Sequence, residues 1–371
     1  MQSLHYNADM TAIKVLYDGW PLVRQANSPA ALHLLTILAY LPEEIRAVVA
    51  LPEEAPEWFP STAIAYVHPL PNSERAHLRW EQRDLARIAD KTGADIIHTT
   101  SPNAPFFSDM PVLVSPSGFG TNGNNARGMI SRLRTSMGSG GAARATGLLW
   151  PSDLSTTGDV APIYRVPPVV HPDFSPVPFG EQESPDIPGV EMPETYTLYH
   201  GPGNEQSLRN LLRSWTWASG PIGEYYPLLL LGLDAAARQL TENLITKFDH
   251  KETVRIFPPI TPQYLTALYQ NCSALYHPAS ISPWGGPVRH ALACARPVVA
   301  FENLDVDAMA GPAAFLVPPD DLRAFGAAMI SVVIKESIYE ALSDAAEKRV
   351  KEWNIHLFTD KLLKVYRELR A

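Results

Sequence analysis

The residues from His277 to Phe301, HPASISPWGGPVRHALACARPVVAF, read as a strand end, a tight turn of Gly and Pro, and the start of a helix. A helix that begins there offers free N–H groups and the positive end of its dipole to an anion. The turn leaves the backbone accessible to a diphosphate. Because no carboxylate stands in this turn or in the first helical turns, the stretch predicts anion binding without an obvious acid or base. The alternative is a merely tight connection between strand and helix.

A second turn, GPGNEQSLRNLLRSW, follows the apolar run YTLYH. Gly201 and Gly203 would let the backbone approach a ligand before a helix that begins near Ser207. A dinucleotide fingerprint needs a third small residue where Gln206 stands. A nicotinamide site is therefore the weaker interpretation of this turn.

Short β-rich apolar runs alternate with helical patterns along the whole chain, which indicates an α/β protein with parallel sheets. A chain of 371 residues is long enough for two domains. Pro recurs without a hydrophobic period at 169–196, as in a semi-rigid linker. We expect strands at 12–18, 47–52, 63–69, 94–100 and 111–117, then at 195–201, 226–232, 253–259, 273–279, 296–301 and 313–319. Helices are expected at 30–41 and 73–92.

Composition excludes several classes of protein. The hydrophobic fraction of 46% is typical of a folded chain, and a net charge of -9 argues against a general nucleic-acid binder. Cys272 and Cys294 lie in apolar surroundings, which favours buried thiols over disulfides or a metal centre. The N-terminus lacks the pattern of a signal peptide, and no apolar run is long enough to span a bilayer. We expect a cytoplasmic protein.

The first half of the chain has polar residues at two positions that could face a ligand, just before an expected helix and at the end of an expected strand. Gln25, Asn27 and Ser28 precede the helix near position 30, and an ordinary N-cap explains Ser28. His98 ends the run ADIIHTT, where a histidine more commonly only bonds to backbone. These residues are candidates for a ligand site, with those structural roles as the alternatives.

Two segments carry positive charge. Four arginines recur at four-residue spacing, with Glu81 and Asp84 beside them; a solvated stripe is the default interpretation, and docking at an anionic membrane surface is the sharper one. The arginines are Arg75, Arg79, Arg83 and Arg87. Residues 118–147 predict a mobile loop that leads into a short basic helix at 127–134. This loop is either a solvated connection or a substrate lid or basic surface for an anionic acceptor.

Six segments in this order resemble the retaining GT-B glycosyltransferases of family 4. They are ADIIHTTSPN, LLWPSDLSTTGDVAPIYRVPPVVHPDFSP, YTLYHGPGNEQSLRNLLRSW, VRIFPPITPQYLTALYQNCSALYHPASISPWGGPVRHALACARPVVA, MAGPAAFLVPPDDLRAFGAAM and WNIHLFTDKLLKVYREL. The second of them is similar to the family's serine-led helix and its passage into the linker. The resemblance covers nearly the whole chain and implies two Rossmann-like, doubly wound parallel-sheet domains that face a cleft.

The resemblance also assigns roles to the parts of the chain. It implies an acceptor-binding domain at 1–175, a Pro-rich linker at 176–193, a nucleotide-sugar-binding domain at 194–350, and a helix at 351–371 that crosses back to the first domain. The expected donor site comprises Gly201, Gly203, Gln206, Pro259, Pro283, Trp284, Gly285, Gly286, Pro287 and Val288. The acceptor side comprises Gln25, Asn27, Ser28, His98, Ser115 and Ser117. No metal and no cofactor beyond the donor substrate are implied.

The chain departs from the family at the residues that carry its chemistry. Ser282 and His290 stand where the family has two Glu, and Pro202 and Gln206 stand where it has Arg and Lys. The family's acceptor-side His falls near Ser115 and Ser117. We expect His290 and Ser282 to be the catalytic candidates, with a core histidine as the alternative for the former. Arg209, Arg289 and Arg296 are candidate substitute cations, although Arg289 is also consistent with a side chain that points to solvent. A hydrophobic plug is the more common role for Trp284 than a platform for sugar.

Three functions fit this sequence. The first is transfer of a sugar from a nucleotide-diphosphate sugar to a glycan or lipid-linked acceptor, with retention, in surface polysaccharide or glycoconjugate synthesis. The second is an inactive GT-B protein that serves as partner or scaffold for an active glycosyltransferase. The third is a nonhydrolysing epimerase, which would need paired carboxylates that the sequence does not reveal. We also expect peripheral contact of the protein with the inner membrane, and no nucleic-acid partner.

Overall fold

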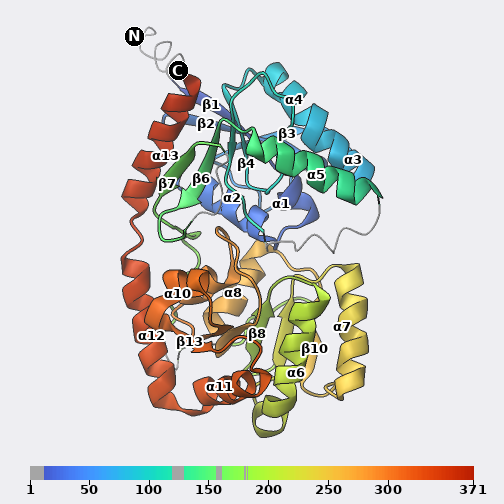
Figure 1. The fold of residues 1–371 in the computed structure, drawn as a ribbon, viewed down its shortest axis with the longest axis vertical. Coiled ribbons are helices and arrows are strands. Elements are labelled where there is room, and N and C mark those ends of the chain that lie inside the picture. The colour runs from blue at the N-terminus through green and yellow to red at the C-terminus, as the bar shows by residue number, and fades with distance from the viewer. Residues whose placement is uncertain (1–11, 119–128, 156–160, 179–180, 182) are drawn as a thin grey trace. The chain divides into compact units, whose positions relative to one another are not determined.

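The computed structural model describes residues 12–118, 129–155, 161–178, 181 and 183–371. The chain forms two compact units, each with its own parallel sheet (Figure 1). The first unit comprises Met1–His171, Pro283–Gly285 and Asn354–Ala371. The second comprises Pro172–Ser282 and Gly286–Trp353. Three residues of the predicted diphosphate turn and the C-terminal helix thus belong to the first unit.

The first unit is built on a seven-stranded sheet with the order β3-β2-β1-β4-β5-β6-β7, in which all neighbours are parallel. The change of direction between β1 and β4 makes the sheet doubly wound. The strands are β1 (Ile13–Asp18), β2 (Ile45–Leu51), β3 (Ile64–Val67), β4 (Ile96–Thr99), β5 (Val112–Val114), β6 (Gly147–Pro151) and β7 (Ile163–Val166). The first five lie where the apolar runs predict them.

Alternation along β1 divides the core of the first unit between the two faces of the sheet. Val15 and Tyr17 pack with α2 (Pro29–Ala39) and α13 (Ile355–Arg370). Leu16 packs on the opposite face with Leu85 of α4 (Leu85–Thr92) and with Trp80. Since successive strand residues point to opposite faces, helices on both sides explain why the consecutive residues Val15, Leu16 and Tyr17 are all buried. The prediction that the C-terminal helix packs on the first domain is confirmed.

The second unit has a six-stranded sheet with the order β10-β9-β8-β11-β12-β13, again parallel throughout. Its strands are β8 (Thr197–His200), β9 (Leu228–Leu231), β10 (Val254–Ile256), β11 (Ala274–His277), β12 (Val298–Phe301) and β13 (Ala314–Val317). Its helices are α6 (Glu205–Ile222), α7 (Ala235–Phe248), α8 (Pro262–Asn271), α9 (Pro287–Ala293), α10 (Leu304–Ala310), α11 (Leu322–Ile334) and α12 (Glu336–Lys351). The expected fold class of two Rossmann-like parallel sheets is confirmed.

The helix expected at 73–92 is interrupted. It consists of α3 (Glu74–Arg79), a π-helical turn (Trp80–Asp84) and α4. The wider turn changes which side chains face inward, and Trp80, Glu81 and Asp84 are all buried. The expectation that the two acidic residues lie on a solvated face is therefore wrong.

Residues 147–155 differ from the expected serine-led helix, because Gly147–Pro151 is strand β6 and the residues after it form a turn. This segment joins the sheet instead, because residues 148–151 pair in parallel with residues 163–166 of β7. The basic helix expected at 127–134 is α5 (Met129–Ala143), which is longer than predicted, and the start of the expected range lies outside the described residues. Cys272 and Cys294 are buried free thiols, as predicted. Among the described helices, none is both long and apolar enough to cross a bilayer.

Candidate functional site

Two of the predicted donor turns lie at the same place in the second sheet. One follows β8 and leads into α6, and the other follows β11 and leads into α9. β8 and β11 are parallel neighbours, and the strand order changes direction between them. Ligands of doubly wound sheets bind beyond the carboxyl ends of the strands at such a switch point. The topology thus brings together the two turns that sequence reasoning selected separately.

The turn before α6 has packing reasons for both of its glycines. A Cβ at Gly203 would lie 2.4 Å from the Cβ of Ala237 on α7, and one at Gly201 would lie 2.7 Å from the ring of Tyr199. Asn204 caps α6, because its side chain accepts a hydrogen bond from Ser207 N. The helix therefore begins two residues earlier than predicted. Its first free N–H groups follow directly after β8, where an anion could accept from them.

The remaining predicted residues near these turns are more exposed. Gln206 is exposed and donates to Asn210, and Pro259 is exposed in the loop after β10. Arg209 makes an ion pair with Glu205 one helical turn away, with nitrogen–oxygen distances of 2.6 and 2.7 Å. This pair lies on the exposed face of α6, where a cation remains available to a ligand only if the pair opens.

The turn after β11 divides between the two units at Pro283 and Gly286. Trp284 is fully buried in the core of the first unit, where its indole Nε1 donates to Leu149 O at 3.1 Å and its ring stacks on His33 with centroids 4.7 Å apart. The buried indole therefore favours the hydrophobic plug over a platform for sugar.

Gly285 is the position in this turn where glycine is required. Its φ is +58°, a region that L side chains rarely adopt, and an added Cβ would lie 2.1 Å from the carbonyl oxygen of Pro29 at the start of α2. Gly286 is tight for a different reason, since its added Cβ would approach Ser282 O at 3.0 Å. Within the first unit, Trp284 and Gly285 are thus held close against α2 by the indole and by the backbone.

The catalytic candidates lie deep in the second unit. Ser282 and His290 are both fully buried. The imidazole of His290 stacks on Phe174, with centroids 4.1 Å apart and an interplanar angle of 13°, and meets the edge of Tyr269 at 5.6 Å. This aromatic packing favours the core histidine that the sequence left as an alternative. A direct role in catalysis stays a prediction.

The substitute cations have structural partners. Arg289 is buried, with its guanidinium 5.7 Å from the ring centroid of Trp353. The expectation that this side chain points to solvent is wrong, because α9 is covered on all sides. Arg296 is buried as well, and donates to Val177 O, Gln270 O and the hydroxyl of Tyr339. It joins the linker segment to two helices of the second unit.

The predicted acceptor residues divide into a loop and a buried group. Ser28 is the N-cap of α2, as predicted, and its hydroxyl accepts from Ala31 N at 3.3 Å. Gln25 is exposed and Asn27 is partly buried in the same loop. Thr100, directly after β4, donates to Ala30 O at 2.8 Å and so ties the first turn of α2 to the carboxyl edge of the first sheet.

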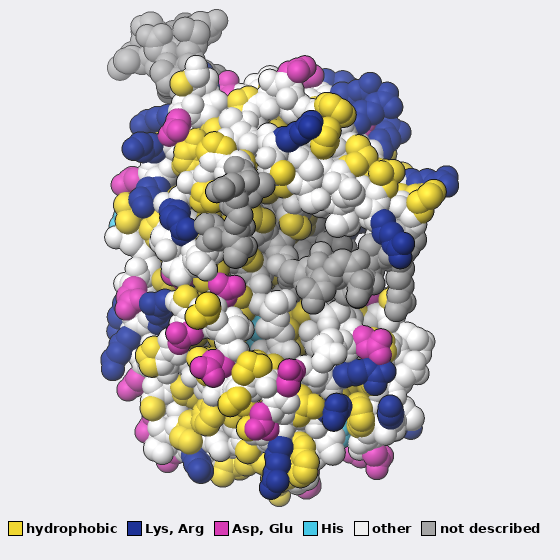
Figure 2. Space-filling view, in the orientation of Figure 1, with side chains coloured by type: hydrophobic (Ala, Val, Ile, Leu, Met, Phe, Trp, Pro, Cys, Tyr) yellow, Lys and Arg dark blue, Asp and Glu magenta, His cyan; other side chains and the backbone are white. Residues whose placement is uncertain are grey.

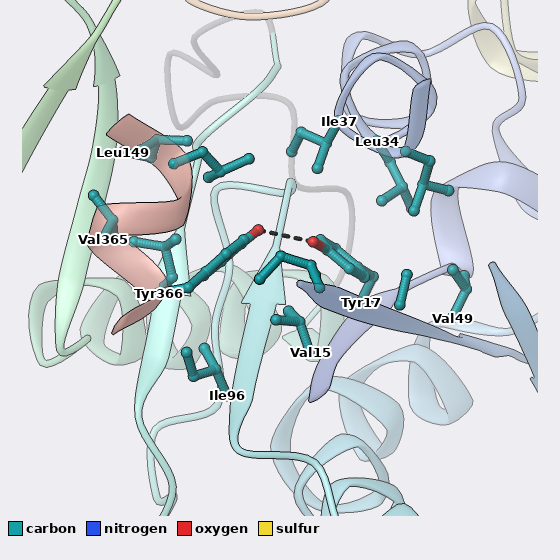
Figure 3. Close-up of a cluster of buried hydrophobic side chains, with 14 of the residues drawn as sticks. Val15, Tyr17, Leu34, Ile37, Val49, Ile96, Leu149, Val365 and Tyr366 are labelled. Atoms are coloured by element: carbon teal, nitrogen blue, oxygen red, sulfur yellow. Dashed lines mark hydrogen bonds between the residues drawn. The ribbon is translucent and has the colours of Figure 1, made fainter. Parts of the chain in front are cut away.

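His98 belongs to a buried chain of hydrogen bonds that passes through the C-terminal helix and ends on β1. Its Nδ1 lies 2.7 Å from the hydroxyl of Tyr366. That hydroxyl lies 2.8 Å from the hydroxyl of Tyr17, and the dashed line in Figure 3 marks this second bond. Its Nε2 lies 2.9 Å from Ser115 Oγ, and Ser117 Oγ donates to Ser115 O. Burial lowers the pKa of His98 to about 3, so the ring is neutral at physiological pH. Both ring nitrogens already have protein partners.

A second buried group was missed by sequence reasoning. Asp18, at the carboxyl end of β1, accepts from Trp80 Nε1 at 2.8 Å. Glu81 accepts from Asn103 at 3.1 Å and from Arg134 of α5 at 3.0 Å. Burial raises the pKa of Glu81 to about 7, and the nearby charge of Asp18 adds to the increase. Burial also raises the pKa of Asp18. The signal that could have found Asp18 was a carboxylate as the last residue of a buried strand.

Comparison with known proteins finds similarity to glycosyltransferases over part of the chain. Residues 201–334 match the model of the family described as glycosyl transferases group 1. The O-antigen chain mannosyltransferase B of Escherichia coli is 21% identical over 175 residues, which are 47% of this chain and 46% of that protein. The match thus spans about half the length of this curated relative.

Solved structures share the fold over nearly the whole chain. The sucrose-phosphate synthase of Thermosynechococcus elongatus has a TM-score of 0.67 at 15% identity, covering 96% of this chain and 99% of its own. The Anabaena protein HepE, solved in complex with UDP and glucose, has a TM-score of 0.64 at 13% identity, covering 96% and 100%. At this identity the similarity establishes the fold alone, which is GT-B.

Proposed function

We propose that this chain transfers a sugar from a nucleotide-diphosphate sugar to an acceptor. The GT-B fold and the match of residues 201–334 to the model of group 1 glycosyl transferases support the proposal. The acceptor is a glycan or a lipid-linked sugar, the reaction proceeds with retention, and the product enters surface polysaccharide or glycoconjugate synthesis. The observation that carries the proposal is the family match itself, because it covers both turns at the switch point of the second sheet.

The proposed donor site uses backbone more than side chains. The first N–H groups of α6 and of α9 would hold the diphosphate beyond β8 and β11. Transfer needs the leaving charge stabilised, and loss of one such donor or cation at an active site typically costs roughly a hundredfold to a thousandfold in rate. With Pro202 and Gln206 in place of the cations, we expect slow turnover compared with relatives that keep them.

A second candidate function is an inactive GT-B protein that acts as partner or scaffold for an active glycosyltransferase. The burial of His290 against Phe174 favours it, because this ring would have to leave its aromatic contacts to reach a ligand. The replacement of the family's first Glu by the buried Ser282 favours it as well.

Nucleotide binding followed by a transfer assay separates the two candidates. The purified protein is titrated with UDP, GDP, ADP, CMP and dTDP by calorimetry, and the sugar nucleotides of any ligand are then incubated with the protein. UDP-glucose and a nucleotide mannose come first, given what is bound by HepE and the name of the Escherichia coli relative. Binding with release of diphosphate nucleotide supports the enzyme. Binding without turnover, in the presence of cell-extract glycolipids, supports the inactive partner.

His290 is tested in the same assay. If its ring contacts phosphate, His290→Ala should weaken nucleotide binding about tenfold, whereas His290→Phe should restore packing against Phe174 but not binding. If both variants bind as the wild type does, the ring has only a packing role.

A further inference from the structure

A groove on the first unit combines positive charge with apolar walls. It has a volume of about 490 Å³ and lies between the helical segment 74–92 and α5. Its lining residues are Arg75, Leu78, Arg79, Gln82, Arg83, Met129, Ile130 and Met137. None of the candidate catalytic, donor-binding or acceptor-side residues lines this groove, so the proposed donor chemistry does not account for it.

The arginines of this groove are available to a partner. Arg75, Arg83 and the adjacent Arg87 are exposed, and none of the ion pairs within the described part of the chain involves them. Arg79 pairs with the buried Asp84 at 3.0 Å and is still half exposed. Dark-blue side chains gather at the upper right of Figure 2, over the helices labelled α3 to α5 in Figure 1. The protein as a whole has a net charge of -9, so this concentration of positive charge is a local exception.

The apolar side chains next to these arginines are unusually exposed. Met129 is 84% exposed and Leu133, one helical turn further along α5, is 48% exposed. Residues four apart lie on the same face of a helix. Yellow side chains lie beside the dark-blue ones in Figure 2. Large apolar groups rimmed by cations match an interface between acyl chains and anionic headgroups.

Buried contacts fix α5 in the position that forms this groove. Arg134 Nη1 lies 3.0 Å from the buried Glu81 Oε1, and its Nε lies 3.3 Å from Glu74 Oε2. Arg134 also donates to His77. Burial and the adjacent guanidinium lower the pKa of His77 to about 3, so its ring is neutral at physiological pH. The groove therefore has a built wall, with one arginine facing inward while the others face solvent.

We propose that this groove docks the protein on a bilayer surface that contains anionic phospholipid, with the arginines at the headgroups and the methionines and Leu133 at the acyl boundary. Charge complementarity selects an anionic surface, and the exposed apolar groups select a bilayer over a free anion. The proposal does not depend on turnover, so its outcome and that of the nucleotide titrations are separate.

Co-sedimentation with vesicles tests the proposal on the full chain. Vesicles of phosphatidylcholine alone are compared with vesicles containing phosphatidylglycerol, at low salt and at about 0.5 M salt, where the Debye length is a few ångströms. We expect binding to the anionic vesicles only, weakened by salt. Because each arginine near an anionic surface is worth roughly fivefold in partitioning, the double variant Arg75→Glu/Arg83→Glu should lose about twenty-five-fold or more.

Matched variants separate docking from general charge effects. Arg213→Glu/Lys251→Glu changes the net charge equally at exposed positions of the second unit and should bind within about twofold of the wild type. Met129→Asp should weaken binding at high salt as well. If the glutamate pair misfolds, Arg75→Gln/Arg83→Gln replaces it.

Several results would overturn the proposal. These are equal binding to neutral and anionic vesicles, no binding to either, or an equal loss in the second-unit control. A self-associated species in sedimentation velocity that only the groove variants abolish would assign this face to a second copy instead.

Discussion

Glu81 gives the sharpest prediction about the first unit, because its carboxyl is buried beside Asp18 and has a raised pKa. A pKa that is higher in the folded state than in the unfolded state means that folding favours the protonated form. The stabilisation is therefore complete below about pH 4.5 and is lost as the pH rises to about 7. At 1.36 kcal/mol per pKa unit, this change costs about 3 kcal/mol between these limits.

Glu81→Gln removes the ionisation while keeping the shape of the side chain. The variant should lack this loss, so its free energy of unfolding relative to the wild type should rise by about 3 kcal/mol between pH 4.5 and pH 8. Arg134 remains hydrogen-bonded in either form, because an amide oxygen can accept from it. Glu74→Gln is the control, since it removes an exposed carboxylate that pairs with the same arginine. A change under about 1 kcal/mol is expected there.

Urea unfolding at several pH values, combined with calorimetric scans that resolve the two units, measures this difference. The double difference between variant and wild type at two pH values cancels other titrating groups. Parallel stability curves for wild type and Glu81→Gln across this range would refute the reasoning. They would show that the folded protein does not hold Glu81 in the protonated form.

Three further pairs of variants test local features of the structure by thermal or urea unfolding. Gly285→Ala should destabilise the first unit by about 3 kcal/mol, since it combines a left-handed backbone with a clash against Pro29 O. Its control is Gly189→Ala, at φ +74° with open space around it, which should cost about 1 kcal/mol. Equal losses of stability in the two variants would contradict the packing of Gly285 against Pro29. Tyr366→Phe removes the hydroxyl that bonds to both Tyr17 and His98 and should lower the free energy of unfolding by about 2 kcal/mol. Tyr17→Phe, which removes a hydroxyl with one of these bonds, should lower it by less. The reverse order would show that the Tyr366 hydroxyl does not bridge the two residues. Asp249→Gly should raise the stability of the second unit by about 1 kcal/mol, because it relieves a positive φ and an unfavourable charge at the end of α7, and Asp249→Ala should gain less.

Most strands were predictable from local residue patterns in the sequence. Strands such as 12–18 and 273–279 are marked by consecutive apolar residues in their middle, Val15 to Tyr17 and Ala274 to Tyr276, which are buried on both faces of the sheet. β6 and β7 were missed, because a Pro at the end of one and an Arg in the other weaken the apolar pattern. The π-helical turn was missed for a related reason, since its extra residue changes the helical period that the prediction relies on.

The candidate site was predictable in position but not in its partners. The two turns at β8 and β11 follow from their Gly and Pro content, and their adjacency follows from the topology of a doubly wound sheet. The burial of His290 against Phe174, and of Trp284 against His33, depends on contacts between residues more than 100 positions apart. Such contacts are set by the tertiary fold, and no local pattern encodes them.

The central claim is that the turns after β8 and β11 hold the diphosphate of a nucleotide sugar. Calorimetric titration of the full chain with UDP, GDP, ADP, CMP and dTDP tests it most directly. We predict binding of one nucleoside diphosphate at a stoichiometry of one, weakened when Gly286→Val places a side chain against Ser282 in this turn. Absence of heat for all five nucleotides, with the protein shown to be folded, would contradict the claim.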